Sequence, residues 1–472
     1  MQEKEIRWKT SFLLFSIYLC LFIFLTGCDT GKTGIPDPPE PLLDLPPVSD
    51  KLVARIYFDA TLSMQGFVVP DSTHYTRICP ALESAIVSGW RDETVSFFRF
   101  GERVEPIDRN TYLQVGDENF YQTDIGIRTY IEKIIENEDP LVKPQMEGSN
   151  TLEGATEIDV NNMPEEGTEA DSTENRLVVI VTDLFQDNGD INRLVPELKE
   201  KCIKKGVAVG LFGLRSQFDG TVYDIGIGEG SSLRYRSTPG NPETFRPFYL
   251  LVLGKHADIA HYFNRLIANG FSEAETIIFS QYLVSPLLSF DGAKIEKLEN
   301  LIRDTIAEKP DSRLKEYRIR NRDRSSKISA KMKYELLPHA MPFDSNIFES
   351  PPKVEHNRYN SDERKEISQA AKECLGVTST FAKNGNGDEL IVDFELDSRV
   401  LPRRTVYLYK VALCPKIDTY QVPEWCSGWD MGTGRNGAKT LNLVNFVNGL
   451  TDIAVSEHQP KIAQFYFYVE KR

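Results

Sequence analysis

The sequence predicts an α/β fold, in which a doubly wound, mostly parallel sheet is followed by a smaller β-rich domain. Two observations support this prediction. Between residues 51 and 270, short apolar runs alternate with segments of helical apolar spacing, as in strands joined by crossover helices. The run at 177–182 (LVVIVT) is apolar throughout, which is typical of a strand buried on both faces of a parallel sheet.

The elements of this α/β part follow one another in a regular order. Strands are predicted at 52–58, 94–100, 103–107, 177–182, 207–214 and 248–253. Helices are predicted from apolar residues spaced three and four apart, at 79–90, 125–135, 191–205 and 257–268. Sheets of this kind bind ligands beyond the carboxyl ends of their strands. We therefore expect the functional residues at that edge.

An acidic insertion interrupts the predicted α/β domain at 136–175. It contains twelve acidic residues and one lysine, with few large apolar residues. Such a segment buries too little apolar surface to order itself, so it is interpreted as a solvated surface loop. The alternative is a tether that recruits a basic partner or screens the site.

The chain after residue 270 falls into two predicted parts. Residues 271–325 are expected to link the domains through a helix at 295–306. Their basic run at 313–327 is interpreted as a solvated linker or, alternatively, as a segment that docks on an acidic face. Residues 326–472 are predicted to form the β-rich domain, with strands at 328–336, 389–396, 405–413 and 462–469 and a helix at 439–450.

Residues 1–27 have the features of a lipoprotein signal peptide. Three cations, Lys4, Arg7 and Lys9, precede eighteen uncharged residues, and the run ends in LTGC. This ending resembles a bacterial lipobox, which implies that Cys28 is lipidated and anchors the chain to a bacterial cell membrane, facing the periplasm or the exterior. An uncleaved helical anchor is the alternative. The Pro-rich residues 28–50 are interpreted as a tether.

The composition argues against several classes of function. Asp and Glu outnumber Lys and Arg by 70 to 55, giving a net charge of −15, so no nucleic-acid partner is expected. The P-loop, G-x-S-x-G and H-E-x-x-H motifs are missing, which argues against the common enzyme classes. The one G-x-G-x-x-G, at 432–437, follows a Trp-rich loop instead of a strand, and this context predicts a turn.

Oxygen-bearing side chains gather where predicted strands end and where one predicted helix begins. Carboxylate and hydroxyl oxygens are hard donors that suit Mg²⁺ or Ca²⁺ better than soft metals. Because strands of a parallel sheet end at a common edge, these side chains are expected to converge there. The candidate metal ligands are Asp59, Thr61, Ser63, Thr123 and Asp183.

The first group of these residues resembles the metal-ion-dependent adhesion site of von Willebrand factor A domains, which have a Rossmann-like fold. The bacterial pattern is D-x-S-x-S-M-x-G, and here it is represented by Asp59, Thr61, Ser63, Met64 and Gly66. Thr61 replaces a serine and keeps the hydroxyl. Gly66 is expected to allow a tight turn.

Two further elements of the same family pattern follow in order along the chain. Thr123 precedes a predicted helix, as the family's second element requires. Thr182 and Asp183 match the third element, T-D-G, although Leu184 stands where glycine is usual. The resemblance covers residues 51–270 and implies the fold of that family for this part of the chain.

The resemblance implies a mode of binding. In this family the hydroxyls hold a cation directly, at least one aspartate acts through water, and an acidic side chain of a protein partner completes the coordination. The expected cofactor is Mg²⁺, with Ca²⁺ or Mn²⁺ as alternatives, and the expected function is cation-dependent protein binding without catalysis. Two alternatives remain: a scaffold lipoprotein with a silent metal site, and a metal-assisted hydrolase with Asp187 or Asp190 as base.

Overall fold

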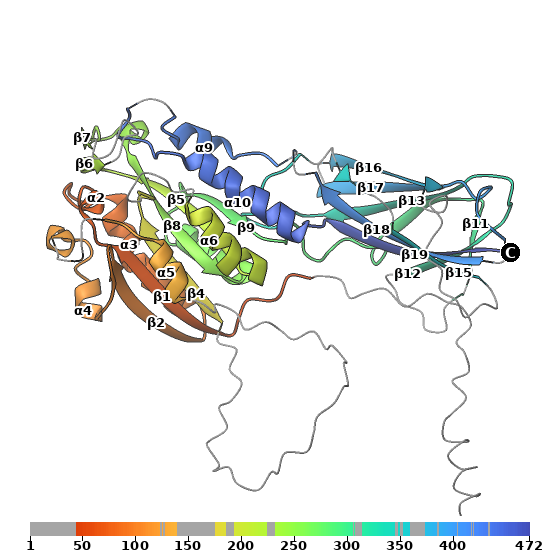
Figure 1. Cartoon of the computed structure of the whole chain (residues 1–472), viewed down its shortest axis with the longest axis horizontal. Coiled ribbons are helices and arrows are strands. Elements are labelled where there is room, and N and C mark those ends of the chain that lie inside the picture. The colour runs from red at the N-terminus through yellow and green to blue at the C-terminus, as the bar shows by residue number, and fades with distance from the viewer. Residues whose placement is uncertain are drawn as a thin grey trace, which may run out of the picture.

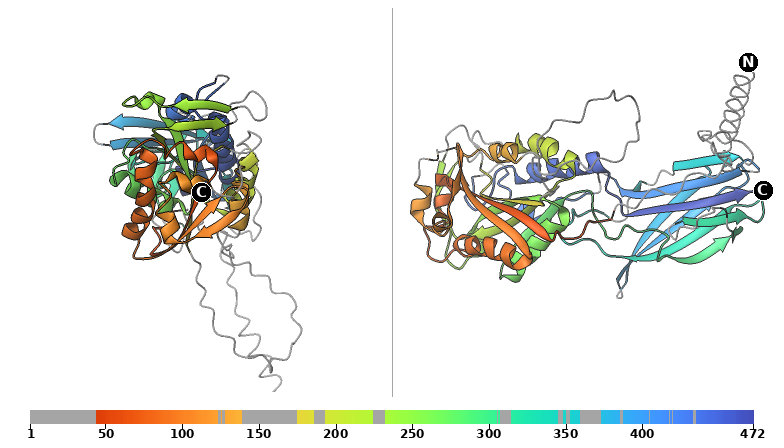
Figure 2. Two further views of the ribbon diagram at one scale, coloured as in Figure 1. Left: turned by 90° about the vertical axis from the view of Figure 1, so that its left-hand side faces the viewer. Right: turned by 90° about the horizontal axis from the view of Figure 1, so that it is seen from below.

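A computed structural model describes most of the chain after residue 43. The described residues are 44–122, 125, 128–138, 175–185, 193–223, 232–304, 306, 314–344, 348–349, 353–358, 373–384, 387–403, 405–416, 418, 420–432 and 435–472. They form an α/β body and a β body, arranged end to end (Figures 1 and 2). The predicted signal peptide, Cys28 and most of the acidic insertion lie outside the described residues. No helix among the described residues is long and apolar enough to span a membrane.

The α/β body is built on a seven-stranded mixed sheet with the order β3-β2-β1-β4-β8-β5-β9. Strands β1, β2, β4 and β5 point one way, whereas β3, β8 and β9 run in the opposite direction. Their bounds are Lys51–Asp59 (β1), Asp92–Phe100 (β2), Val104–Ile107 (β3), Arg176–Thr182 (β4), Ala208–Ser216 (β5), Arg246–Gly254 (β8) and Glu275–Phe279 (β9). The predicted α/β class with a sheet whose strands mostly share one direction is therefore confirmed.

Helices cover both faces of this sheet, because its central strands are apolar on both sides. In β1, Ile56 and Phe58 pack into the core on one face, whereas Tyr57 packs into the core on the other. The first face is covered by α3 (His74–Gly89) and α7 (His256–Ala268). The second is covered by α5 (Glu132–Asn137), α6 (Leu194–Lys201) and α10 (Leu443–His458).

Short elements complete the α/β body around the carboxyl edge of its parallel strands. A two-stranded hairpin of β6 and β7 stands beside this edge (Figure 1). The remaining short elements are α2 (Leu62–Gln65), α4 (Arg109–Tyr112), the 3₁₀ turns Glu118–Tyr121, Ile203–Lys205 and Pro242–Thr244, β6 (Asp219–Tyr223), β7 (Ser232–Arg236) and α9 (Glu424–Trp429).

The β body consists of two packed sheets that share one hydrophobic core. One sheet contains β10 (Lys294–Glu299), β13 (Ser326–Tyr334), β17 (Gly387–Leu396) and β16 (Leu375–Asn384). The other contains β11 (Leu301–Arg303), β12 (Leu314–Ile319), β19 (Ala463–Lys471), β18 (Thr405–Pro415), β14 (Phe348–Glu349) and β15 (Lys353–Arg358).

The helix predicted at 295–306 is wrong. This segment forms β10 and β11, separated by Asn300, whose φ of 55° lies in the left-handed region and ends the first strand. The apolar residues at 295, 298 and 301 are spaced as in a helix, but strand pairing with β13 and β12 determines the outcome.

The segment predicted as the C-terminal domain contributes to both bodies. Helix α10 lies between β18 and β19 in the chain, yet Phe446 and Val447 pack into the core beneath the α/β sheet. Trp429 of α9 joins the same core and stacks obliquely against Tyr249 of β8 at 6.3 Å between ring centroids. The two bodies are thus joined by a chain that crosses between them several times (Figure 1).

Candidate functional site

Four of the five residues predicted as metal ligands converge at the carboxyl edge of β1 and β4. Asp59 ends β1, Thr61 and Ser63 follow it at the start of α2, and Asp183 directly follows β4. The hydroxyl oxygens of Thr61 and Ser63 are 3.1 Å apart, and Ser63 Oγ is 3.4 Å from Asp183 Oδ1. Parallel pairing of β1 with β4 explains the convergence, since both strands end at the same edge.

Asp59 lies at the centre of this cluster and is fully buried. Its Oδ1 accepts hydrogen bonds from the Thr61 backbone at 3.1 Å and the Thr61 hydroxyl at 2.7 Å. Its Oδ2 accepts from the hydroxyls of Thr182 at 3.1 Å and Thr129 at 3.4 Å. The carboxylate therefore orders hydroxyls from three separate segments of the chain.

The third segment of the site supplies Thr129, which the sequence analysis did not identify. Thr129 Oγ1 is 3.2 Å from Thr61 Oγ1. Thr129 is fully buried. The helix predicted at 125–135 is too early, because α5 spans Glu132–Asn137, and Thr129 is the threonine that precedes it closely. Thr123 lies outside the described residues. The family pattern of a threonine before this helix would have led to Thr129, had the helix start been placed correctly.

The chain turns at Gly66, as expected, but close packing is what requires a glycine there. Its φ of −61° is ordinary helical backbone. However, a Cβ built on Gly66 would lie 2.4 Å from the ring of Phe218, which leads into the β6–β7 hairpin. The glycine thus lets the hairpin pack directly on the loop that carries Thr61 and Ser63.

We expect Gly66→Ala to destabilise the protein by about 1–3 kcal/mol, because the added methyl must displace the buried Phe218 ring. Urea unfolding would measure the loss. Gly428→Ala is a matched control, since a Cβ there meets nothing within 4 Å. Equal stability of Gly66→Ala and wild type would show that the hairpin does not pack on this loop.

Leu184 occupies a backbone conformation that glycine adopts more readily than leucine. Its φ is 59°, in the left-handed region where a side chain costs about 1–2 kcal/mol. The Leu184 side chain is buried in the core with Leu194 and Leu198 of α6. Its backbone N–H donates to Thr182 Oγ1 at 3.1 Å, which fixes the loop that presents Asp183.

A buried arginine, Arg246, completes the wall of the site. Its Nη2 donates to Asp183 Oδ2 at 3.1 Å, and its Nη1 donates to the carbonyls of Gly437 at 3.1 Å and Lys439 at 3.3 Å. The guanidinium also stands 5.5 Å from the centre of the Phe218 ring. Arg246 thus links the site to a C-terminal segment that precedes α10.

Arg246 reaches the site because β8 runs antiparallel to β4. The first residue of an antiparallel strand lies at the edge where its parallel neighbours end, and Arg246 is the first residue of β8. The apolar run predicts a strand here from residue 248 but does not predict its direction. An arginine just before a buried strand was the available signal.

Burial and like charge dominate the electrostatics of the site. Burial, followed by the nearby charge of Asp183, raises the pKa of Asp59 to about 7. Hydrogen bonds from Thr61 and Thr182 oppose this shift without cancelling it. Two carboxylates therefore face one guanidinium among the described residues of the site, and an additional cation would relieve the excess negative charge.

In metal-free buffer, the free energy of unfolding should fall as pH rises from about 4 to 7. The unfolded chain releases the Asp59 proton near the ordinary aspartate value of about 3.9. The folded chain holds it to a pKa of about 7. Because the folded state binds more protons in this window, this contribution to stability is present below the lower value and is lost through the upper one.

The variant Asp59→Asn stays neutral and should flatten this part of the pH profile. Urea unfolding in EDTA between pH 4 and pH 8 would compare the variant with wild type. Parallel profiles for the two proteins would refute the assignment of this pH dependence to Asp59.

The donor set fits a small hard cation. Oxygens bound to Mg²⁺ at 2.0–2.1 Å stand about 2.9 Å apart along an octahedral edge. The hydroxyl oxygen of Thr61 is 3.1 Å from that of Ser63 and 3.2 Å from that of Thr129, close to such edges. No group of three or more His, Cys, Asp or Glu side chains with metal-binding geometry occurs in the described ranges. Asp187 and Asp190, the candidate hydrolytic bases, lie outside those ranges.

Comparison with known proteins finds no family model, curated protein or solved structure that matches this chain.

Proposed function

We propose that this protein is a membrane-anchored extracytoplasmic lipoprotein that binds a protein partner through a divalent-cation adhesion site of the von Willebrand A type. The cation, Mg²⁺ or alternatively Ca²⁺ or Mn²⁺, would be held by the hydroxyls of Thr61, Ser63 and Thr129. Asp59 and Asp183 would act as the carboxylates of the site. Cys28 would carry the lipid that holds the protein at the cell membrane, facing the periplasm or the exterior.

The observation that carries this proposal is the mutual spacing of three hydroxyl oxygens around one buried carboxylate. Thr61 Oγ1 lies 3.1 Å from Ser63 Oγ in its own segment and 3.2 Å from Thr129 Oγ1 in another segment, spacings that suit ligands of one small cation. Hydroxyls that only satisfied one another would not need a second, like-charged carboxylate beside them. The pair of Asp59 and Asp183 is costly to bury unless a cation accompanies it.

The residues of the site have distinct tasks in this proposal. A bound divalent cation would supply a positive charge able to attract an acidic side chain of the partner. Neutral hydroxyl ligands leave most of that charge in place. Asp59 orients the hydroxyls of Thr61, Thr129 and Thr182 by accepting their hydrogen bonds. The Leu184 loop fixes Asp183 through the hydrogen bond from the Phe185 amide to Asp183 Oδ1.

A second candidate function is a scaffold lipoprotein whose metal site is silent, and Arg246 is the observation that favours it. Its guanidinium already supplies a positive charge to Asp183 within a buried ion pair. In that case the guanidinium would serve as the permanent cation of the site. The two candidates differ in whether Mg²⁺ binds to the wild-type chain.

Calorimetric titration of the full chain with Mg²⁺, in maltoside micelles at pH 8, separates the two candidates. The adhesion proposal expects saturable binding of one ion at millimolar or lower concentration. Asp59→Asn should abolish it, because the substitution removes the central negative charge. Asp71→Asn, an exposed acid outside the site, is the matched control and should bind as wild type does. If wild type does not bind Mg²⁺, the scaffold candidate with a silent metal site is supported instead.

A further inference from the structure

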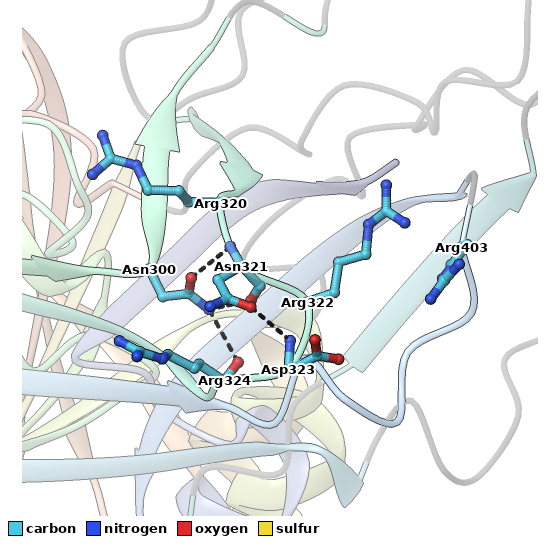
Figure 3. A pocket seen from close by; sticks show the side chains of 7 residues that line it. All are labelled: Asn300, Arg320, Asn321, Arg322, Asp323, Arg324 and Arg403. Atoms are coloured by element: carbon cyan, nitrogen blue, oxygen red, sulfur yellow. Dashed lines mark hydrogen bonds between the residues drawn. The ribbon is translucent and has the colours of Figure 1, made fainter.

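The β body carries a strongly basic pocket at its end away from the α/β body. The pocket has a volume of about 670 Å³ and opens to solvent. Four arginines line it, namely Arg320, Arg322 and Arg324 in the turn between β12 and β13, and Arg403 before β18 (Figure 3). The basic run that was predicted to be a solvated linker, or a segment that docks on an acidic face, forms β12, this turn and the start of β13.

The four guanidinium groups are not neutralised by the described part of the chain. None of them forms an ion pair with a described residue, and Asp323 is the one acidic residue that lines the pocket. This concentration of positive charge stands out in a chain whose net charge is −15. By contrast Arg399, an exposed arginine outside the pocket, pairs with Asp397 at 2.8 Å.

The turn that presents these arginines is held by the partly exposed side-chain amide of Asn300. Asn300 Nδ2 donates to the carbonyls of Asn321 at 2.7 Å and Arg324 at 3.0 Å, and to Ser326 Oγ at 3.2 Å. Asn300 Oδ1 accepts from the Asn321 amide at 2.7 Å. Figure 3 shows the bonds from Asn300 to Asn321 and Arg324. The arginine side chains therefore project from a backbone that is already ordered.

A buried lysine adds to the positive charge behind the pocket. Lys471 is 4% exposed and donates to the backbone carbonyls of Ser398, at 2.6 Å, and Leu401. Its pKa is lowered first by burial and then by the charges of Arg403 and Arg322, while the charges of Asp323 and Asp397 oppose the shift more weakly. Arg322 and Arg403 therefore lie close enough to one ammonium group to repel it, and a bound anion would relieve the repulsion within this cluster.

We propose that this pocket binds a phosphate-bearing anion, held by the guanidinium groups of Arg322 and Arg403. A phosphate group offers three acceptor oxygens and up to two negative charges, so it can accept hydrogen bonds from two guanidinium forks at once. The pocket volume exceeds that of a phosphate group alone, so it has room for the remainder of a phosphoester. A soluble phosphoester and a lipid headgroup share this chemistry.

Titration with inorganic pyrophosphate tests the proposal on the full chain in maltoside micelles, with EDTA present to keep metal ions away. Saturable binding is expected for wild type. Arg322→Ala and Arg403→Ala should each weaken it at least tenfold, because each removes a charge-assisted hydrogen-bonding fork. Arg399→Ala makes the same change in charge outside the pocket and should have no such effect. Equal binding by wild type and the Arg322→Ala, Arg403→Ala double variant would overturn the proposal.

Asn300→Gly tests the role of the ordered turn without altering charge. Glycine accepts the left-handed φ of 55°, and the substitution removes the amide that holds the turn. Pyrophosphate binding should weaken, while the midpoint temperature of thermal unfolding of the α/β body should stay unchanged. Unchanged binding by Asn300→Gly would contradict a preorganised site.

The source of the anion is read from a competition experiment. Micelles doped with phosphatidylglycerol should displace pyrophosphate from wild type if the natural ligand is a lipid headgroup. Displacement by glycerol 1-phosphate, with none by the doped micelles, would assign the pocket to soluble phosphoesters. Failure of both compounds to compete with pyrophosphate would refute a phosphoester site.

Discussion

Arg246→Met is expected to destabilise the metal-free protein by about 3–5 kcal/mol. The substitution leaves the carboxylate of Asp183 buried without its ion-pair partner. A buried charge without a partner strongly destabilises the folded state. It also removes the hydrogen bonds to the carbonyls of Gly437 and Lys439. Urea unfolding in EDTA at pH 8 would measure the loss.

Mg²⁺ should restore a large part of the stability lost in Arg246→Met. A ligand that binds only the folded state adds about 2.7 kcal/mol at one hundred times its dissociation constant. Arg215→Met is the matched control, because Arg215 lies on the neighbouring strand and pairs with the exposed Glu243. That variant should lose less stability and should not respond differently from wild type to Mg²⁺. An Arg246→Met protein that Mg²⁺ leaves unchanged would contradict a cation site beside Asp183.

Thr129→Val is expected to weaken Mg²⁺ binding at least tenfold. Valine keeps the shape of threonine but lacks the hydroxyl that stands 3.2 Å from Thr61 Oγ1. Loss of even a supporting hydrogen-bonding group around a metal typically costs 10–100-fold in affinity. Because the hydroxyl also donates to Asp59, stability in EDTA should fall by about 1 kcal/mol.

Thr123→Val is the informative comparison for Thr129→Val, since the sequence pattern alone pointed to residue 123. Calorimetry on both variants distinguishes the two threonines. A loss of Mg²⁺ affinity confined to Thr123→Val would contradict the site described above.

The strand pattern predicted most of the α/β body and the core of the site. Continuous apolar runs located β1, β4 and β8, and the polar residues after β1 and β4 were expected to converge because parallel strands end together. That reasoning needs the direction of only two strands. The convergence of Asp59, Thr61, Ser63 and Asp183 could therefore be predicted without knowing the order of the other strands.

The features that were missed depend on information the local sequence does not hold. The helix after residue 125 begins later than its apolar spacing suggests, and this hid Thr129. Arg246 joins the site because β8 lies antiparallel between β4 and β5, and strand order is decided by packing across the whole sheet. The segment at 295–306 satisfies helical spacing but pairs with strands distant in the chain.

The arginine pocket is another feature that the local sequence could not predict. A run of basic residues is ambiguous in sequence, since a solvated linker and a binding turn share that composition. The decisive residues Asn300 and Arg403 lie outside the run, and the fold of the β body brings them to it.

The most direct test of the cation site is diffraction from crystals of the chain soaked with Mn²⁺, measured at a wavelength where manganese scatters anomalously. The account predicts one anomalous peak within about 2.2–2.5 Å of the hydroxyl oxygens of Thr61, Ser63 and Thr129. A density map with no peak there at saturating Mn²⁺, and with the Arg246 guanidinium still paired to Asp183, would contradict it.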